Sequence, residues 1–320
     1  MQVFLGVDGG GTQTRSLLVD EQGTVLGRGL AGSTNIHQCD AATFRANLHS
    51  AVEQAFAGMD TDSIELAAAC FGIAGLSTPK AHQQAEAVIA ELKLRPKAVS
   101  ILTDAHIALS GGLAGAPGMV LLAGTGSACF GIDADGSLRR TGGWGSIADD
   151  GGSGGWIGRQ AIECAIRQAD GRRSGELLKN AIFEQLKISS LDQVIQRLHA
   201  ESIQWNEIAA LCPTVLQLAQ SGDADANQIV QRAIDELVAL IRATAAKLDL
   251  TAIPLVLMGG LVDNDSFFTQ RLSKQIRQTV PEIEIQPPHL PPVAGAVLEA
   301  FKLQQNHIPA AFTKRLQASR

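Results

Sequence analysis

The sequence predicts an α/β protein made of two subdomains, each a mixed β-sheet flanked by helices, with a cleft between the two. Three observations lead to this prediction. A glycine-rich loop follows an apolar strand near the N-terminus, the same arrangement recurs in the second half of the chain, and helices alternate with strands after the first loop. The chain of 320 residues is long enough for two domains of ordinary size.

The first glycine-rich loop is the segment GVDGGGTQTR at residues 6–15. Glycine lets backbone N–H groups approach an anion closely, so loops of this kind commonly hold phosphate. The segment lacks the lysine of a Walker loop, and it leads into an apolar strand rather than into the helix of a Rossmann fingerprint. We therefore predict the tip of a β-hairpin, followed by a turn at Gln22-Gly23 and a third strand.

The second loop repeats the first at residues 119–140. A shift of 113 residues superposes Gly11 on Gly124 and Thr12 on Thr125, and the strands and turn that follow also coincide. For one loop alone, a tight turn without a ligand would be the simpler interpretation. Two loops related by one shift indicate duplicated subdomains, whose hairpins would hold one polyphosphate from two sides.

One position breaks this internal symmetry. In the alignment with a shift of 113 residues, Asp8 falls on Leu121. A carboxylate beside only one of two phosphate loops indicates a cation there, and Mg²⁺ held by one carboxylate and water molecules fits that position.

The hydrophobic pattern predicts the remaining elements. In the first half these are helices at 41–58 and 80–93 and strands at 64–73 and 98–103. In the second half they are three strands at 119–140, helices at 156–249, a buried strand from 253 with a Gly-Gly turn and a helix, a proline-rich connector at 286–295 and a last helix at 294–305. We expect an N-terminal subdomain at 1–115, completed by a C-terminal helix at 294–320, and a C-terminal subdomain with a helical insertion at 116–293.

Composition excludes several classes of partner. The net charge is −6 and no Lys/Arg-rich run occurs, which argues against nucleic acid and anionic membranes. No apolar stretch approaches the length of a membrane span, and the N-terminus reads as a strand rather than a signal peptide. The five cysteines are scattered and form no CxxC, which is typical of a reducing cytoplasm. We therefore expect a cytoplasmic protein that acts on small molecules.

Several polar residues lie where ligands could reach them. Asp104 falls between a predicted strand and a predicted helix, so it is either the N-cap of that helix or a residue facing the ligand crevice of the sheet. Asn35 is either a turn residue or a ligand that donates and accepts at once. The hydroxyls of Thr12 and Thr125 either close their own turns or donate to phosphate.

These motifs resemble the acetate kinase/sugar kinase/heat-shock/actin superfamily, and more closely its BadF/BadG/BcrA/BcrD branch, which includes N-acetylglucosamine and glucosamine kinases. The resemblance implies two ribonuclease H-like subdomains of the actin-type ATPase kind. The segments that carry it are GVDGGGTQTR (6–15), GSTN (32–35), GIAGLS (72–77), TDA (103–105), GTGS (124–127), GGWGSIADDGGSGGWIG (142–158) and MGG (258–260).

The resemblance implies a site for ATP and Mg²⁺. It places Asp8 near the metal. It also implies contacts with ATP from both hairpins and from an adenosine pocket, at Gly9, Gly10, Gly11, Thr12, Gly124, Thr125, Gly126, Gly259, Gly260 and Ala209.

The resemblance also implies a sugar site, in which Asp104 takes the proton from the attacking hydroxyl. The residues implied to bind the sugar are Asn35, Gly75, Asp104, Ser127, Gly143, Trp144, Gly145 and Asp150. Two points stay open. Trp144 could stack on the sugar or pack in the core, and Gly151 stands where the family often has Glu or Gln, so one polar contact is in doubt.

The predicted function is transfer of the γ-phosphate of ATP to the 6-hydroxyl of N-acetylglucosamine. Glucosamine is the alternative substrate, because the paired carboxylates Asp149 and Asp150 would suit its ammonium group. An alternative of another class is an ATP-driven activator of a partner redox enzyme with an iron–sulfur cluster, for which Cys129 would be a candidate. An actin-like filament or a chaperone is less compatible with the chain length, and a homodimer is left open.

Overall fold

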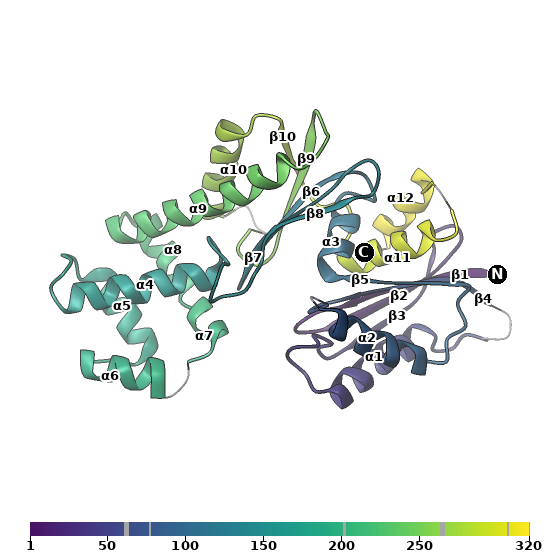
Figure 1. The fold of residues 1–320 in the computed structure, drawn as a ribbon, viewed down its shortest axis with the longest axis horizontal. Helices are drawn as coiled ribbons and strands as arrows, with labels where there is room; N and C mark the ends of the chain where they lie inside the picture. Colours follow the sequence, from purple (N-terminus) through teal and green to yellow (C-terminus); the bar gives the residue numbers. More distant parts are fainter. Residues whose placement is uncertain (61–63, 77, 201–202, 263–265, 306, 320) are drawn as a thin grey trace. The chain divides into compact units, whose positions relative to one another are not determined.

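The computed structural model describes residues 1–60, 64–76, 78–200, 203–262, 266–305 and 307–319. It divides the chain into two compact units (Figure 1). Unit 1 consists of Met1–Pro117 together with Pro287–Arg320, and unit 2 is the contiguous segment Gly118–Gln286. Ser77, the last residue of the GIAGLS motif, lies outside the described residues.

Unit 1 is built on a five-stranded mixed sheet with the order β3-β2-β1-β4-β5. The central strand β1 pairs antiparallel with β2, which pairs antiparallel with β3, whereas β4 and β5 continue the sheet in parallel on the other side. The strands are β1 (Gln2–Gly9), β2 (Thr14–Asp20), β3 (Val25–Ala31), β4 (Glu65–Ile73) and β5 (Ala98–Thr103).

Helices cover both faces of this sheet. The helices of unit 1 are α1 (Ala41–Ala55), α2 (Pro79–Glu91), α3 (Asp104–Gly112), α11 (Pro292–Lys302) and α12 (Ala310–Ala318). Because side chains alternate along a strand, β1 sends Val3, Leu5 and Val7 into the core with α1 and α2, and sends Phe4 into the core with α3, α11 and α12. A Cβ on Gly72 would lie 2.3 Å from a methyl carbon of Ile107, so glycine lets α3 pack closely on the sheet.

Unit 2 repeats the topology of unit 1 with the order β10-β9-β6-β7-β8. The central strand β6 pairs antiparallel with β7 and parallel with β9, as β1 does with β2 and β4. The strands are β6 (Gly118–Ala123), β7 (Ser127–Ile132), β8 (Leu138–Gly142), β9 (Ile253–Met258) and β10 (Ile283–Gln286). The predicted duplication and the predicted α/β fold class are therefore confirmed.

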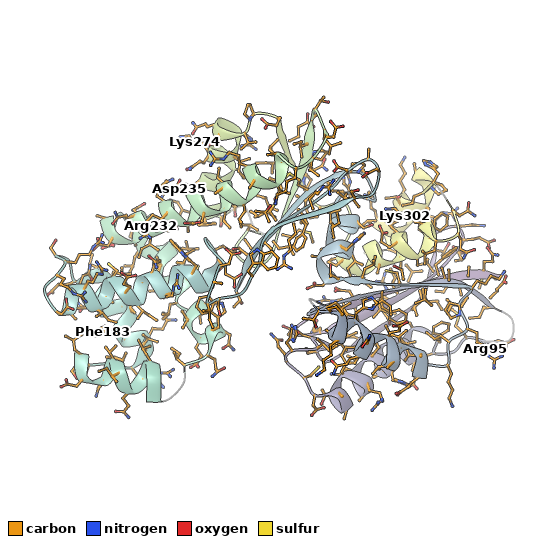
Figure 2. All side chains as sticks on the ribbon, in the orientation of Figure 1. Arg95, Phe183, Arg232, Asp235, Lys274 and Lys302 are labelled. Atoms are coloured by element: carbon orange, nitrogen blue, oxygen red, sulfur yellow. The ribbon has the colours of Figure 1, made fainter. Side chains whose placement is uncertain are left out.

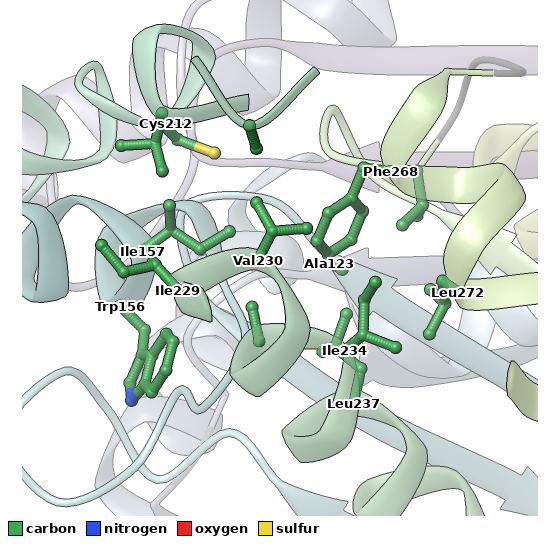
Figure 3. Close-up of a cluster of buried hydrophobic side chains, with 14 of the residues drawn as sticks. Ala123, Trp156, Ile157, Cys212, Ile229, Val230, Ile234, Leu237, Phe268 and Leu272 are labelled. Atoms are coloured by element: carbon green, nitrogen blue, oxygen red, sulfur yellow. The ribbon is translucent and has the colours of Figure 1, made fainter. Parts of the chain in front are cut away.

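The helices of unit 2 bury a large hydrophobic core against this sheet. They are α4 (Gly154–Ala169), α5 (Leu177–Leu186), α6 (Leu191–Ile195), the π-helix Gln196–Ala200, α7 (Trp205–Ala209), α8 (Cys212–Gln220), α9 (Ala224–Ala245) and α10 (Phe267–Thr279). Figure 3 shows Ile234 of α9 with Phe268 and Leu272 of α10 in this core. Charged side chains such as Asp235 and Lys274 lie on the exposed surface of α9 and α10 (Figure 2).

The internal alignment needs a correction of one residue ahead of the loops. Gly9 pairs with Thr14, and Ala123 pairs with Ser127, so the first loop has one residue more than the second. Asp8 of β1 therefore corresponds to Leu122 of β6 and not to Leu121. The partner position remains apolar, and the asymmetry that suggested a cation beside Asp8 is unchanged.

Two elements differ from the sequence prediction. The short strand β10 at the edge of the second sheet was not predicted, and the predicted C-terminal helical segment is two helices, with Pro309 as the N-cap of α12. In the described part of the chain, none of the helices combines the length and the apolar character that crossing a membrane requires.

Candidate active site

In unit 1, the carboxyl ends of three parallel strands bring two carboxylates to one edge of the sheet. Asp8 is the penultimate residue of β1 and pairs with Gly72 of β4. At the same edge, Ile73 of β4 pairs with Thr103, the last residue of β5, and Asp104 follows as the first residue of α3. Ligands of open α/β sheets bind outside the carboxyl ends of the strands, which makes this edge the candidate ligand-binding edge of unit 1.

The carboxylate of Asp8 is held in an unfavourable electrostatic environment. Asp8 is 8% exposed. Burial, together with the charge of the nearby Asp104, raises the pKa of Asp8 to about 6. Arg15 opposes this rise, but its Nη1 lies 3.8 Å from the Asp8 carboxylate and its side chain is 54% exposed, so the pair stabilises the charge weakly. A cation beside Asp8 would relieve this cost.

The structure separates the two interpretations of Asp104. The N-cap of α3 is Thr103, whose hydroxyl accepts the N–H of His106 at 3.2 Å, so the N-cap interpretation of Asp104 is wrong. Asp104 lies in the first turn, where a carboxylate is favoured by the helix dipole. Its Oδ1 accepts the N–H of Ala105 at 2.9 Å. A half-buried carboxylate at this place remains compatible with a general base.

The first glycine loop is tied to the segment that follows β3. Thr34 N–H and the Ser33 hydroxyl both donate to the carbonyl of Gly10, each at 3.2 Å. Asn35 lies between this loop and the end of β4, because its side chain is near both Gly11 and Gly75. The structure thus brings the predicted site residues Gly11, Asn35 and Gly75 of unit 1 together. Thr12 is exposed at the tip of the loop.

The second glycine loop is held by the start of α4 and by an indole. Gly154 and Gly155 donate their N–H groups to the carbonyls of Gly124 and Thr125, at 2.8 and 3.2 Å. Trp205 of α7 donates its Nε1–H to the same Thr125 carbonyl at 3.2 Å. With these carbonyls satisfied, the loop has a defined conformation, and the hydroxyl-bearing Thr125 is exposed.

A pocket of about 460 Å³ in unit 2 opens beside this loop. It brings together four residues that the sequence assigned to the nucleotide: Gly124, Thr125, Ala209 and Gly260. Its other lining residues are mostly apolar or small, as a nucleobase requires. They are Gly154, Asn206, Ala210, Cys212, Pro213, Leu216, Leu261 and Ser266.

The two glycines after β9 have different roles, which gives a first testable prediction. Gly259 has φ +110°, and a Cβ there would lie 2.5 Å from the carbonyl of Ala123, whereas a Cβ on Gly260 meets nothing within 4 Å. Gly259→Ala is therefore expected to destabilise the protein by about 1–3 kcal/mol, seen as a lower Tm. Gly260→Ala is expected to keep the Tm but raise the KM for ATP severalfold, since it lines the pocket. An unchanged KM for ATP in Gly260→Ala would argue against the pocket as the nucleotide site.

The glycine-rich loop after β8 carries the predicted sugar residues of unit 2. Trp144 is 69% exposed, so the interpretation that it packs in the core is wrong. Its backbone N–H donates to the Asp149 carboxylate at 3.3 Å. Gly143 and Gly145 flank it, both with positive φ. By contrast, Trp156, near the start of α4, is in the core.

Asp150 and Ser127 lie together at the base of this loop. Oδ1 of Asp150 accepts the N–H of Ser127 at 3.2 Å, and Asp150 itself has φ +63°. Burial raises the pKa of Asp150, while the Ser127 N–H and Arg140 lower it. The hydroxyl of Ser127 donates to the carbonyl of Gly151 at 2.7 Å, so in this structure it holds the loop. A Cβ on Gly126 would also meet the Asp150 carboxylate. The predicted residues Gly126, Ser127 and Asp150 therefore lie side by side.

The cysteines are mostly buried, although Cys212 also lines the pocket beside the second glycine loop. Cys70, Cys129, Cys164 and Cys212 are buried, and Cys39 is half-buried. Burial raises the pKa of Cys129 and of Cys212 to about 12, so neither offers a thiolate at neutral pH. Cys129 is 0% exposed in β7, so its thiol is not available at the protein surface.

Two functional residues of α7 were not predicted from the sequence. Trp205 holds the second glycine loop, and Asn206 lines the pocket. They lie in the five-residue helix α7, whose length leaves no periodic signal. Arg140 was missed as well. A basic residue next to a glycine-rich loop was the available signal for it, and its contacts are described below.

The model of the BadF/BadG/BcrA/BcrD ATPase family matches residues 5–300 of the chain. The N-acetyl-D-glucosamine kinase of Dictyostelium discoideum is 29% identical over 312 residues, which cover 94% of this chain and 98% of the relative. An N-acetylmuramic acid/N-acetylglucosamine kinase of Clostridium acetobutylicum is 29% identical over 287 residues, covering 89% of this chain and 94% of the relative.

Among solved structures, similarity extends to a Chromobacterium violaceum protein assigned provisionally as an N-acetylglucosamine kinase. Its TM-score is 0.72 at 26% identity, and the match covers 93% of this chain and 98% of that chain. The match therefore extends over the sequences of both units.

Proposed function

Because the chain belongs to the BadF/BadG/BcrA/BcrD ATPase family, we propose that it is an ATP-dependent amino-sugar kinase acting on the 6-hydroxyl of N-acetylglucosamine. The names of relatives that match it over nearly their whole length support this substrate class. The observation that carries the proposal is the pair Asp8 and Asp104 at the carboxyl ends of β1 and β5, beside a glycine hairpin loop.

In this proposal unit 2 binds the nucleoside part of ATP. The pocket lined by Ala209, Gly260 and the second glycine loop has the size and the apolar lining of a small-molecule site. The loop residues Gly124, Thr125 and Gly126 would contact phosphate oxygens through N–H and hydroxyl groups. Gly259, which was also assigned to the nucleotide, would hold the turn that places Gly260 at the pocket.

Unit 1 would supply the metal ligand and the base. Asp8 fits Mg²⁺ because it is a buried carboxylate whose described ion pair, with the exposed Arg15 at 3.8 Å, stabilises its charge only weakly. One carboxylate with water molecules is a common way to hold this ion. When bound, Mg²⁺ neutralises charge on the phosphates. Gly9, Gly10, Gly11 and Thr12 would position phosphate at the first loop.

The residues proposed to bind the sugar come from unit 1 and from unit 2. In unit 1, Asn35 and Gly75 lie together, and Asp104 would orient the 6-hydroxyl and accept its proton as the phosphoryl group is transferred. In unit 2, Asp150, Ser127 and the loop Gly143-Trp144-Gly145 would contact the sugar. Phosphoryl transfer depends mainly on positioning and on charge stabilisation, which is what such residues supply.

The substrate is tested by ADP release coupled to a reporter, across N-acetylglucosamine, glucosamine, N-acetylmannosamine, N-acetylmuramate and glucose. We expect kcat/KM for N-acetylglucosamine to exceed that for glucose at least tenfold, because a site that hydrogen-bonds an amide discriminates strongly against a sugar that lacks it. The product should carry phosphate at the 6-oxygen by NMR. ATP turnover that no sugar stimulates would overturn the proposal, and preference for glucosamine would reassign the substrate.

The alternative function, an ATP-driven activator of a redox enzyme, is not favoured, because Cys129 is fully buried and the matching relatives are named as sugar kinases.

The five cysteines are all free thiols, which supports the cytoplasmic location expected from their spacing.

A further inference from the structure

Arg140 makes an unusual set of contacts with the loop that follows its own strand. It lies in β8, and its side chain reaches the residues just after it. Its Nε donates to the carbonyl of Gly142 at 2.9 Å, and its Nη2 donates to the carbonyl of Gly143. The guanidinium carbon lies 4.3 Å from the centre of the Trp144 ring, so the cation covers one face of the indole.

The loop needs such a support because its backbone has little conformational preference of its own. Gly142, Gly143 and Gly145 have φ of +75°, +75° and +96°, a region that glycine visits freely. Trp144, between them, is 69% exposed, so packing contacts do not fix its ring. The planar guanidinium stacks on an aromatic face while donating in its own plane, and Arg140 uses both abilities.

We infer that Arg140 is a positioning residue for the sugar: it fixes the indole of Trp144 so that the uncovered face is presented to the substrate. The inference rests on the proposed function, in which this loop binds sugar. An aromatic ring offers a sugar an apolar surface, and a ring that is already immobilised loses less entropy on binding. Arg140 also acts on Asp150, whose pKa it lowers against the effect of burial, so it helps to keep that carboxylate ionised.

The test is a double-mutant cycle on the Kd for N-acetylglucosamine, measured by calorimetry without ATP. We expect Arg140→Gln and Trp144→Phe each to raise this Kd about tenfold. The double variant should be little worse than either single variant, because residues in contact act as one unit. Arg140→Lys should fail to restore binding, since an ammonium group lacks the planar fork. The KM for ATP should change less than twofold in all of them.

Arg139 provides the matched control. It is the neighbouring arginine, its Nε lies 3.5 Å from Asp133, and it makes no contact with Trp144 among the described interactions. Arg139→Gln should bind N-acetylglucosamine as the wild type does. Tm values identify variants that fail to fold. The indole N–H resonance of Trp144, assigned among the three tryptophans by its absence in Trp144→Phe, should shift in Arg140→Gln, which reports loss of the stack without any sugar.

The outcomes are distinguishable. If the wild type does not bind N-acetylglucosamine, the proposed function fails and this inference fails with it. If the wild type binds and Arg140→Gln binds equally well, or if the two single effects simply add, the inference alone is overturned. Equal changes in the constants for sugar and ATP would indicate a general structural role instead.

Discussion

Asp104→Asn is expected to lower kcat at least a hundredfold, to change the Kd for the sugar less than tenfold, and to leave the Tm nearly unchanged. Asparagine keeps the size and one acceptor oxygen but does not take a proton. General-base contributions are about 10²–10⁴-fold, or about 3–5 kcal/mol in the barrier. The measurement is steady-state turnover with calorimetric sugar binding.

Thr103 provides the control for this experiment, because it is the N-cap of α3 and Asp104 is not. Thr103→Ala removes the acceptor of the His106 N–H and should cost about 1 kcal/mol of stability. The two effects should therefore separate: lost turnover without lost stability for Asp104→Asn, and lost stability for Thr103→Ala. If Asp104→Asn turns over sugar within a few-fold of the wild type, the base lies elsewhere, and Asp150 is the next residue to test.

Asp8→Asn is expected to lower kcat about a hundredfold and to raise the Mg²⁺ concentration needed for half-maximal activity. A bound cation contributes several kcal/mol of charge stabilisation to phosphoryl transfer, and a neutral amide is a weaker ligand for it. Titration of activity with MgCl₂ measures the effect. The prediction is wrong if Asp8→Asn loses activity at every Mg²⁺ concentration in proportion to a loss of folded protein.

Without metal, the same variant should be at least as stable as the wild type. The pKa of Asp8 is raised from 3.8 to about 6 by burial, so the folded state binds the proton more tightly than the unfolded state. The wild type therefore loses stability between about pH 4 and pH 6, by up to about 3 kcal/mol in total and by about 1.4 kcal/mol above pH 5, and Asp8→Asn does not. Urea unfolding in EDTA at pH 5 and pH 7.5 compares the two proteins.

Most of the fold was predictable because its signals are local. The hairpin at Gln22-Gly23, the helices α1 and α2 and the strands β4 and β5 each come from a periodic pattern or a turn signal in a short stretch of sequence. The duplicated sheet followed from comparing two such stretches. β10 was missed because a four-residue strand at a sheet edge has too short a pattern, and its place depends on pairing with β9.

The candidate site was predictable to the extent that it consists of glycine loops and residues at strand ends. Asp8, Asp104 and Asn35 lie where strand polarity and turn signals placed them. The contacts of Arg140 with Trp144, and of Trp205 with Thr125, were not predictable, because they depend on side-chain directions in irregular segments. Likewise, the N-cap of α3 is Thr103, one residue before the predicted Asp104. A sequence pattern does not fix the first residue of a helix to within one position.

The chain leaves unit 1 at Pro117 and returns to it only at Pro287. The aromatic rings that close its core come from both ends, with Phe4 packed 5.0 Å from Phe301 and Phe301 4.4 Å from Phe312, between ring centres. During translation, unit 2 therefore has its complete sequence before unit 1 does. Strand β1 therefore lacks the part of its core that α11 and α12 supply until those two helices have been synthesised.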